Sequence, residues 1–181
     1  MDPLHWTAYR GFLKCIFTKD YDGAILDFQK AQQYSRDDYV MDHTYCFYEG
    51  LCNLELGNYS MAEKNLTRDI SIQTGGDKDK ETSAHYNSLL YLGIVYYEMK
   101  DNDKAKEYLL KCMAIYKELP EANYYLALIY ERENNAELKL KYLQIAKESS
   151  LKGFGLNEDN VYDAYYPHQV TLYEIEEEMG Y

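Results

Sequence analysis

Turn-forming residues and positive charge are both scarce in this sequence of 181 residues. Three prolines and ten glycines are too few for a collagen-like or low-complexity chain, and they favour helices over many short strands. Lysine and arginine total 19 against 31 aspartate and glutamate residues, which gives a formal net charge of −12. A chain of this charge repels a phosphate backbone, so nucleic acid is disfavoured as its main ligand.

Long hydrophobic runs and targeting segments are missing as well. The longest stretch without a charged residue lies between Glu81 and Glu98, and it is too short and too polar to span a bilayer. The first residues contain neither a basic nor an apolar segment of the kind found in signal peptides. These features predict a soluble, cytoplasmic protein with no membrane partner.

Cysteine and histidine patterns that hold metals or support catalysis are also lacking. The four cysteines form no CxxC pair, and their apolar surroundings predict buried thiols. The four histidines have no metal-binding spacing, and no phosphate-binding glycine loop or GxSxG motif occurs. The glutamates within residues 174–178 are nearly consecutive, so on a helix they form a solvated face rather than an acid–base pair. The sequence therefore predicts no enzyme, no metal and no cofactor.

Tyrosine and apolar residues, by contrast, are abundant. Apolar residues make up 46% of the chain, which is enough for a core and excludes wholesale disorder. The length suits one domain. The 22 tyrosines exceed what a core requires, and a ring with a polar end suits binding surfaces.

A repeat of about 34 residues organises the chain. Residues 92–96 align with residues 126–130, and the match continues with Leu109 against Leu143. Within each copy, apolar residues recur at intervals of three and four, and a polar turn separates two such runs. This pattern predicts helical hairpins. The helices of a pair are expected to cross closely at small residues, which are Gly50, Gly93 and Ala127.

Several residues signal where helices begin. Ser60 followed by Glu63 is a candidate capping box for the second helix of one hairpin. Pro120 suits the first turn of another helix. Beyond the repeats, an aromatic stretch at 161–167 precedes a last helix that is predicted over 168–179.

These residues resemble the tetratricopeptide repeat (TPR) family, which places a large apolar residue, Leu-Gly and Tyr on the first helix of each pair. The best-matching copy carries the pattern through Leu89, Leu92, Gly93, Tyr96, Ala105 and Leu109. The resemblance implies an all-α fold, a TPR-like α-solenoid of helix-turn-helix repeats with a C-terminal capping helix. It assigns residues 1–150 to the repeats and 151–181 to a tail packed on them. The copies lie near 5–36, 43–72, 84–118 and 120–149.

In the TPR family the first helices of the pairs line a concave groove. The resemblance assigns to this groove the partner-binding residues Trp6, Tyr9, Leu13, Phe47, Leu51, Asn87, Leu90, Ile94, Tyr97, Tyr124 and Leu128. The face carries no lysine or arginine, so it lacks the residues with which TPR co-chaperones hold a C-terminal carboxylate. Either a partner or the chain's own tail fills such an apolar groove. The tail side chains expected to fill or cap it are Tyr162, Tyr165, Tyr166, Leu172, Tyr173 and Ile175.

The predicted function is that of a non-enzymatic protein–protein interaction module. Its acidic charge predicts a basic protein partner, because complementary potentials speed encounter and reject wrong partners. A concrete version is an immunity or antitoxin-type protein that neutralises a cationic toxin. The alternative is an adaptor or secretion chaperone that holds an apolar peptide or helix of a client in the groove.

Overall fold

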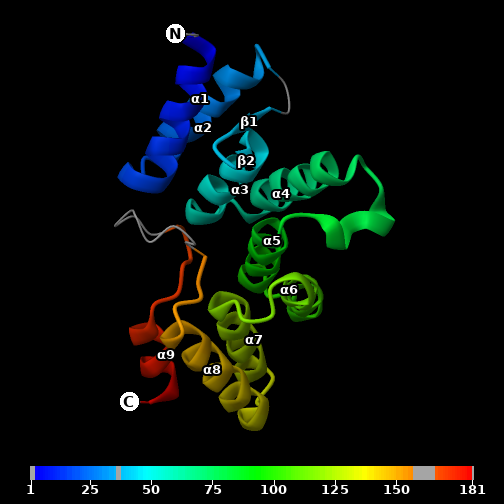
Figure 1. The fold of residues 1–181 in the computed structure, drawn as a ribbon, viewed down its shortest axis with the longest axis vertical. Coiled ribbons are helices and arrows are strands. Elements are labelled where there is room, and N and C mark those ends of the chain that lie inside the picture. Colours follow the sequence, from blue (N-terminus) through cyan, green and yellow to red (C-terminus); the bar gives the residue numbers. More distant parts are fainter. Residues whose placement is uncertain (1–2, 36–37, 157–165, 181) are drawn as a thin grey trace. The chain divides into compact units, whose positions relative to one another are not determined.

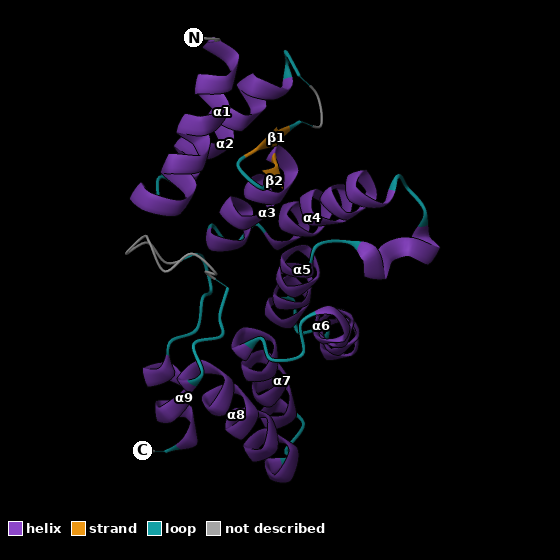
Figure 2. Ribbon diagram, in the orientation of Figure 1, coloured by secondary structure: helices purple, strands orange, loops and turns teal. Residues whose placement is uncertain are grey.

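The computed structural model describes residues 3–35, 38–156 and 166–180. Contacts within the chain divide it into two compact units, Met1–Ala84 and His85–Tyr181, which we call unit 1 and unit 2. Helices dominate the described residues of both units, as Figures 1 and 2 show. The all-α prediction is therefore confirmed. The predicted division between repeats and tail at residue 150 stays a prediction.

Among its described residues, unit 1 contains two helical hairpins with a short β-hairpin between them in the sequence. Its elements in chain order are α1 (Pro3–Leu13), the π-helix η1 (Lys14–Thr18), α2 (Tyr21–Gln32), β1 (Tyr39–Val40), β2 (His43–Thr44), α3 (Tyr45–Glu55), α4 (Tyr59–Thr74) and the 3-10 helix η2 (Lys78–Ser83). Helix α1 packs against α2, and α3 packs against α4. The antiparallel β-hairpin pairs Tyr39 with Thr44, and the repeat pattern did not predict it.

The described part of unit 2 contains two further hairpins and a last helix. Its elements are α5 (Tyr86–Glu98), α6 (Asn102–Ile115), α7 (Pro120–Arg132), α8 (Ala136–Leu151) and α9 (Leu172–Met179). Helix α5 packs against α6 and also touches α7, while α8 packs against both α7 and α9. Consecutive helices thus pair into hairpins in both units.

The first hairpin contains a π-helical turn that apolar spacing does not reveal. The backbone N–H groups of Lys19 and Asp20 both donate to the carbonyl oxygen of Lys14, the latter over 3.1 Å. Lys19 then adopts a left-handed φ of 56° and ends the helix. A π-turn holds more residues than an α-turn, so the side chains after it are rotated relative to those of a regular helix.

Glycine allows the two helices of a hairpin to approach closely, as predicted. A Cβ atom added to Gly50 on α3 would lie 2.7 Å from Cγ of Leu66 on α4. One added to Gly93 on α5 would lie 2.9 Å from Cγ of Leu109 on α6. Real Cβ atoms do not approach other carbons this closely, so larger residues would separate the helices.

The helix ends differ in part from the sequence prediction. Pro120 is the first residue of α7, as expected. The expected capping box at Ser60 is not formed, because α4 begins at Tyr59 with Asn58 at its N-cap, so that Ser60 lies within the first turn of the helix. A capping box occurs instead at α9, where Thr171 and Glu174 cap each other's backbone N–H groups. This cap makes the last helix begin at Leu172, later than predicted.

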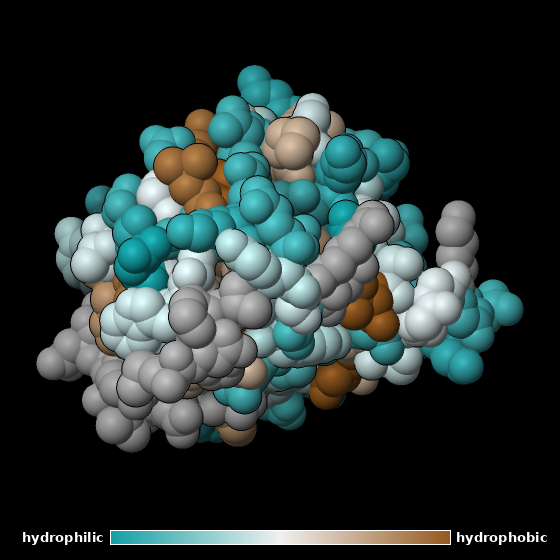
Figure 3. Space-filling view, turned by 90° about the horizontal axis from the view of Figure 1, so that it is seen from above, coloured by the Kyte–Doolittle hydropathy of each residue, from teal (hydrophilic) through white to brown (hydrophobic). Residues whose placement is uncertain are grey.

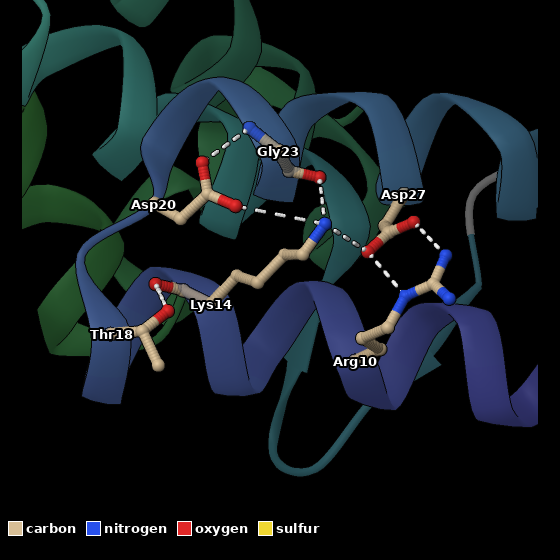
Figure 4. A network of polar contacts seen from close by, with 6 residues as sticks. All are labelled: Arg10, Lys14, Thr18, Asp20, Gly23 and Asp27. Carbon is tan, nitrogen blue, oxygen red and sulfur yellow. Dashed lines mark hydrogen bonds and ion pairs between the residues drawn. The ribbon is translucent and has the colours of Figure 1, made fainter.

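A charged network ties α1 to α2 in unit 1 (Figure 4). Asp27 on α2 is buried, and its carboxylate accepts hydrogen bonds from Nε of Arg10 at 2.8 Å and from the Nη2 atom of the same guanidinium. Nζ of Lys14 lies 3.0 Å from the same carboxylate and also donates to the carbonyl oxygen of Gly23. Burial by itself raises the pKa of Asp27, but the bonds from Arg10 and Lys14 outweigh it and hold that pKa below its ordinary value.

We expect Asp27→Ala to lower the free energy of unfolding of unit 1 by about 2 kcal/mol at neutral pH. The loss stays moderate because Arg10 is partly exposed and water can solvate its freed guanidinium. Fluorescence of Trp6, the only tryptophan, follows the unfolding of this unit in denaturant. The exposed Asp22→Ala on the same helix is the control, with a loss of at most about 0.5 kcal/mol.

Acid should remove the difference between Asp27→Ala and the wild type. A carboxyl whose pKa is lowered by folding contributes stability above its unfolded pKa of about 4 and loses it as pH falls further. Equal losses in the Asp27 and Asp22 variants, or a difference that persists in acid, would contradict the role of the network.

Candidate interaction surfaces

The groove residues predicted in unit 1 divide into buried and accessible side chains. Phe47 and Leu51 on α3 have no exposed area. The ring of Phe47 instead stacks on His43, with ring centroids 3.9 Å apart. Trp6 on α1 is 49% exposed, whereas Tyr9 and Leu13 are half-buried. These α1 residues are therefore accessible to a partner. Phe47 and Leu51 are core residues in this structure.

Trp6 and Tyr9 belong to a run of aromatic side chains that we call the α1 aromatic row, which consists of Trp6, Tyr9 and Phe12 on α1 and Phe17 on the following η1. Successive ring centroids lie 6.0, 5.9 and 5.9 Å apart. Phe12 is buried and packs edge-on against Tyr48, while Phe17 is 41% exposed. The row thus presents two exposed rings, Trp6 beside the half-buried Tyr9 and Phe17 beside the buried Phe12. On the face of the molecule seen in Figure 3, hydrophobic residues form separate patches among hydrophilic ones.

The groove residues predicted in unit 2 also divide by depth. Asn87, Leu90 and Ile94 on α5 are buried, because nearly every side chain of this helix faces the core. The half-buried members are Tyr97 at the end of α5, and Tyr124 and Leu128 on α7. We call these three residues the tyrosine surface. Asn87, Leu90 and Ile94 are thus core residues here, and the tyrosine surface is what a partner could touch.

An arginine of the same unit lies against the tyrosine surface. Cζ of Arg132, the last residue of α7, lies 3.4 Å from the ring centroid of Tyr97. Its Nη1 atom donates to the backbone carbonyl oxygen of Tyr97 at 2.7 Å. A guanidinium over a tyrosine ring at this distance makes a cation–π contact.

Carboxylates surround the tyrosine surface. Burial raises the pKa of Tyr124 to about 12, and Glu178, Glu174 and Glu177 on α9 contribute to the rise. Burial likewise raises the pKa of Tyr97, an effect that Arg132 opposes and that Glu98 and Glu131 reinforce. Lys139 on α8 bonds to both Glu131 and Glu178. The potential around these rings is therefore mainly negative.

The C-terminal segment packs on the other helices of unit 2. The hydroxyl of Tyr91 on α5 donates to the carbonyl oxygen of Pro167 at 2.7 Å, and the Tyr125 hydroxyl lies 2.7 Å from Nδ1 of His168. On α9, Ile175 is fully buried in a cluster with the side chains Ala127, Leu143 and Ala146. Tyr124 packs against this cluster as well. The described tail thus contacts α5, α7 and α8.

The tail residues that were predicted to fill or cap the groove differ in how deeply they are buried. Ile175 is buried, and Tyr166 and Leu172 are half-buried. Tyr173 is 72% exposed and does not fill a groove, since a position two residues from Ile175 lies on the opposite side of the helix. Tyr162 and Tyr165 lie outside the described residues.

A buried carboxyl of α7 faces the backbone of the tail at two places, Leu156 and Val170. Glu121, in the first turn of α7, is 1% exposed, and its Oε1 atom accepts a 3.4 Å hydrogen bond from the backbone N–H of Leu156. The backbone of Val170 faces the same carboxyl and favours its ionised form. Its Oε2 atom has no hydrogen-bond partner among the described residues. Burial dominates these effects and raises the pKa of Glu121 to about 7.

The possible metal ligands, the cysteines and the longest helices of the described part of the chain form neither a metal site nor a membrane-spanning segment. Within residues 3–35, 38–156 and 166–180, no three His, Cys, Asp or Glu side chains are grouped to hold a metal ion. All four cysteines are buried, as predicted. Among the same residues, no helix is both long and apolar enough to cross a bilayer.

Sequence reasoning missed the charged residues around the tyrosine surface. Arg132 lies four positions after Leu128 on α7, and this spacing places both side chains on one helix face. The spacing was thus a usable signal. No comparable signal exists for Glu174 and Glu177, because only the docking of α9 brings them to Tyr124.

Comparison with known proteins is consistent with this architecture. Residues 87–118, which span α5 and α6, match the family model of the tetratricopeptide repeat. A crystal structure of MamA aligns with a TM-score of 0.66 and 20% identity, over 83% of this chain and 80% of that one. The structure MamA 41-end from Desulfovibrio magneticus RS-1 aligns with a TM-score of 0.66 and 15% identity, over 83% and 75% of the two chains.

A third solved structure that resembles this chain is a TPR protein. TTC0263, a thermophilic TPR protein in Thermus thermophilus, aligns with a TM-score of 0.50 and 17% identity, over 82% of this chain and 92% of that one. No curated protein sequence matches the chain. At these identities the likeness concerns the fold.

Proposed function

We propose that this chain, a helical-repeat protein of the tetratricopeptide repeat type, is a non-enzymatic interaction module that binds a basic protein partner in the cytoplasm. In the most specific form of this proposal, it neutralises a cationic toxin by covering its basic surface. The observation that carries the proposal is the combination of half-buried tyrosines with an excess of carboxylates in unit 2. Tyrosine supplies contact area at low entropic cost, and the net charge of −12 attracts a basic partner.

A second candidate is an adaptor that holds an apolar segment of a client. The exposed rings of the α1 aromatic row, Trp6 and Phe17, favour it, because exposed aromatic side chains are typical anchors in interfaces. The full burial of Leu90 and Ile94 counts against a long apolar groove as the docking place. In the first candidate opposite charges hold the partner, and in the second apolar contacts hold it.

Salt dependence distinguishes the two. The tagged full-length chain is used to capture partners from an extract of its native cells at about 0.05 M and about 0.5 M salt, and captured proteins are identified by mass spectrometry. We expect a strongly basic protein that is retained at low salt and lost at high salt. Retention of a neutral or acidic client at both salt concentrations, abolished by Trp6→Ala, would instead support the adaptor.

A further inference from the structure

We propose that the tyrosine surface of unit 2 binds arginine side chains of a basic protein segment, and that Arg132 occupies the face of Tyr97 when no such segment is bound. This inference rests on the proposed function, since it names the place and the side chain through which a basic partner is held.

Charge is the first argument. The carboxylates that act on Tyr97 and Tyr124 are Glu98, Glu131, Glu174, Glu177 and Glu178. The described cations that meet this group are Arg132 and Lys139. Lys139 is already engaged by two of the carboxylates, so the others provide negative potential that an incoming cation can use.

The aromatic rings supply the second argument. Tyr97 and Tyr124 are half-buried, so each is held by its neighbours yet keeps part of its side chain accessible. Both rings pack against Tyr125, at centroid distances of 5.3 and 5.7 Å. Fixed aromatic faces beside carboxylates attract a cation through the ring quadrupole and the negative charge together.

The position of Arg132 gives the third argument, because it shows which group the surface accommodates. Its guanidinium lies over the Tyr97 ring and donates to the Tyr97 carbonyl oxygen at the same time. That carbonyl belongs to the last turn of α5, where the helix dipole favours a cation. A planar guanidinium lies flat on a ring while the N–H groups at its rim donate, and it is more weakly hydrated than an ammonium group, so we expect arginine to be preferred over lysine.

The test uses the full-length chain and three fluorescently labelled peptides of equal length: oligoarginine, oligolysine and oligocitrulline. Citrulline keeps the shape of arginine without its charge. Fluorescence anisotropy at low salt should show that oligoarginine binds more tightly than oligolysine, and at least about 10-fold more tightly than oligocitrulline. Equal binding of the arginine and citrulline peptides would overturn the proposal.

Variants locate the binding to the surface. Tyr124→Leu keeps an apolar side chain but loses the aromatic face, and it should weaken oligoarginine binding by about 3-fold to 5-fold. The double variant Glu98→Gln/Glu177→Gln should weaken it by a similar factor. The matched double variant Glu118→Gln/Glu148→Gln makes the same charge change at exposed positions of the same unit and should change binding by less than about 2-fold.

Arg132→Gln is the sharpest variant, because it is expected to act in the opposite direction. It frees the face of Tyr97 and removes a positive charge, so oligoarginine binding should strengthen by about 3-fold. Weaker or unchanged binding would show that Arg132 is not a stand-in for a bound arginine. Far-ultraviolet circular dichroism of each variant verifies that unit 2 remains folded.

The outcome separates this inference from the proposed function. If the wild type retains a basic partner but the surface variants bind it as tightly as the matched control, the inference fails while the proposed function stands. If the wild type retains no basic protein, the proposed function fails.

Discussion

Replacement of Gly93 by leucine is expected to lower the free energy of unfolding of unit 2 by at least about 3 kcal/mol. A Cβ atom at this position lies 2.9 Å from Cγ of Leu109 and 3.2 Å from its backbone nitrogen. The side chain of Leu109 can rotate, but its backbone nitrogen moves only if α6 moves. A leucine at residue 93 therefore forces α5 and α6 apart and opens the core between them.

Alanine at the same position gives a graded test. In a helix without close contacts, Gly→Ala stabilises by about 1 kcal/mol, so a loss of stability in Gly93→Ala reports the contact with α6. Denaturant unfolding with hydrogen exchange of the α6 amides measures the effect. Leu109→Ala should offset part of the loss in the Gly93→Ala background, as expected for directly coupled residues. A gain in stability from Gly93→Ala alone would refute the close crossing.

The second large effect concerns Glu121 and pH. Its pKa of about 7 in the folded state lies above the ordinary value of 4.5. The unfolded chain releases this proton first, so the free energy of unfolding of unit 2 should fall as pH rises from about 4.5 to about 7 and then level off. At 1.36 kcal/mol for each pKa unit, the fall is roughly 3 kcal/mol.

Glu121→Gln should remove this pH dependence. The groups that face the carboxyl are the backbones of Leu156 and Val170 and the thiol of Cys112, so the side chain has no described cation to balance its charge. The variant should match the wild type near pH 4.5 and exceed its stability by roughly 3 kcal/mol at pH 8. Glu118→Gln, exposed in the preceding loop, is the control and should keep the pH dependence of the wild type. A Glu121→Gln protein that is less stable than the wild type at pH 8 would contradict the argument.

Local spacing was enough to predict the helix pairs of both units. The spacing of apolar residues, the small residues Gly50 and Gly93 and the proline at residue 120 each act within one hairpin, so a linear pattern contains their information.

Depth of burial was harder to predict. Leu90 and Tyr124 occupy equivalent positions in successive copies, yet Leu90 is fully buried and Tyr124 half-buried. The difference depends on what packs over each helix, which no repeat pattern states.

In the tail as well, the sequence did not predict which single residues would be buried. Because both side chains are large and largely apolar, Tyr173 and Ile175 were both predicted to face the repeats. The capping box at Thr171 sets where α9 begins, and the docking of Ile175 on Ala127 and Ala146 sets which side faces the repeats. With that orientation fixed, helix geometry turns Tyr173 outward. Composition alone could not choose between the two faces.

The π-helix at Lys14–Thr18 affects how the first hairpin is aligned with other repeats. A π-turn is an α-helix that has accepted one additional residue without breaking. Deleting one residue from this segment would restore the α-helix, and the residues before and after the segment would keep their places on the same faces of the helix. An alignment of this chain with regular repeats therefore needs a one-residue gap within residues 14–18. Without that gap, Trp6 and Tyr9 are matched to positions one place away from their structural equivalents.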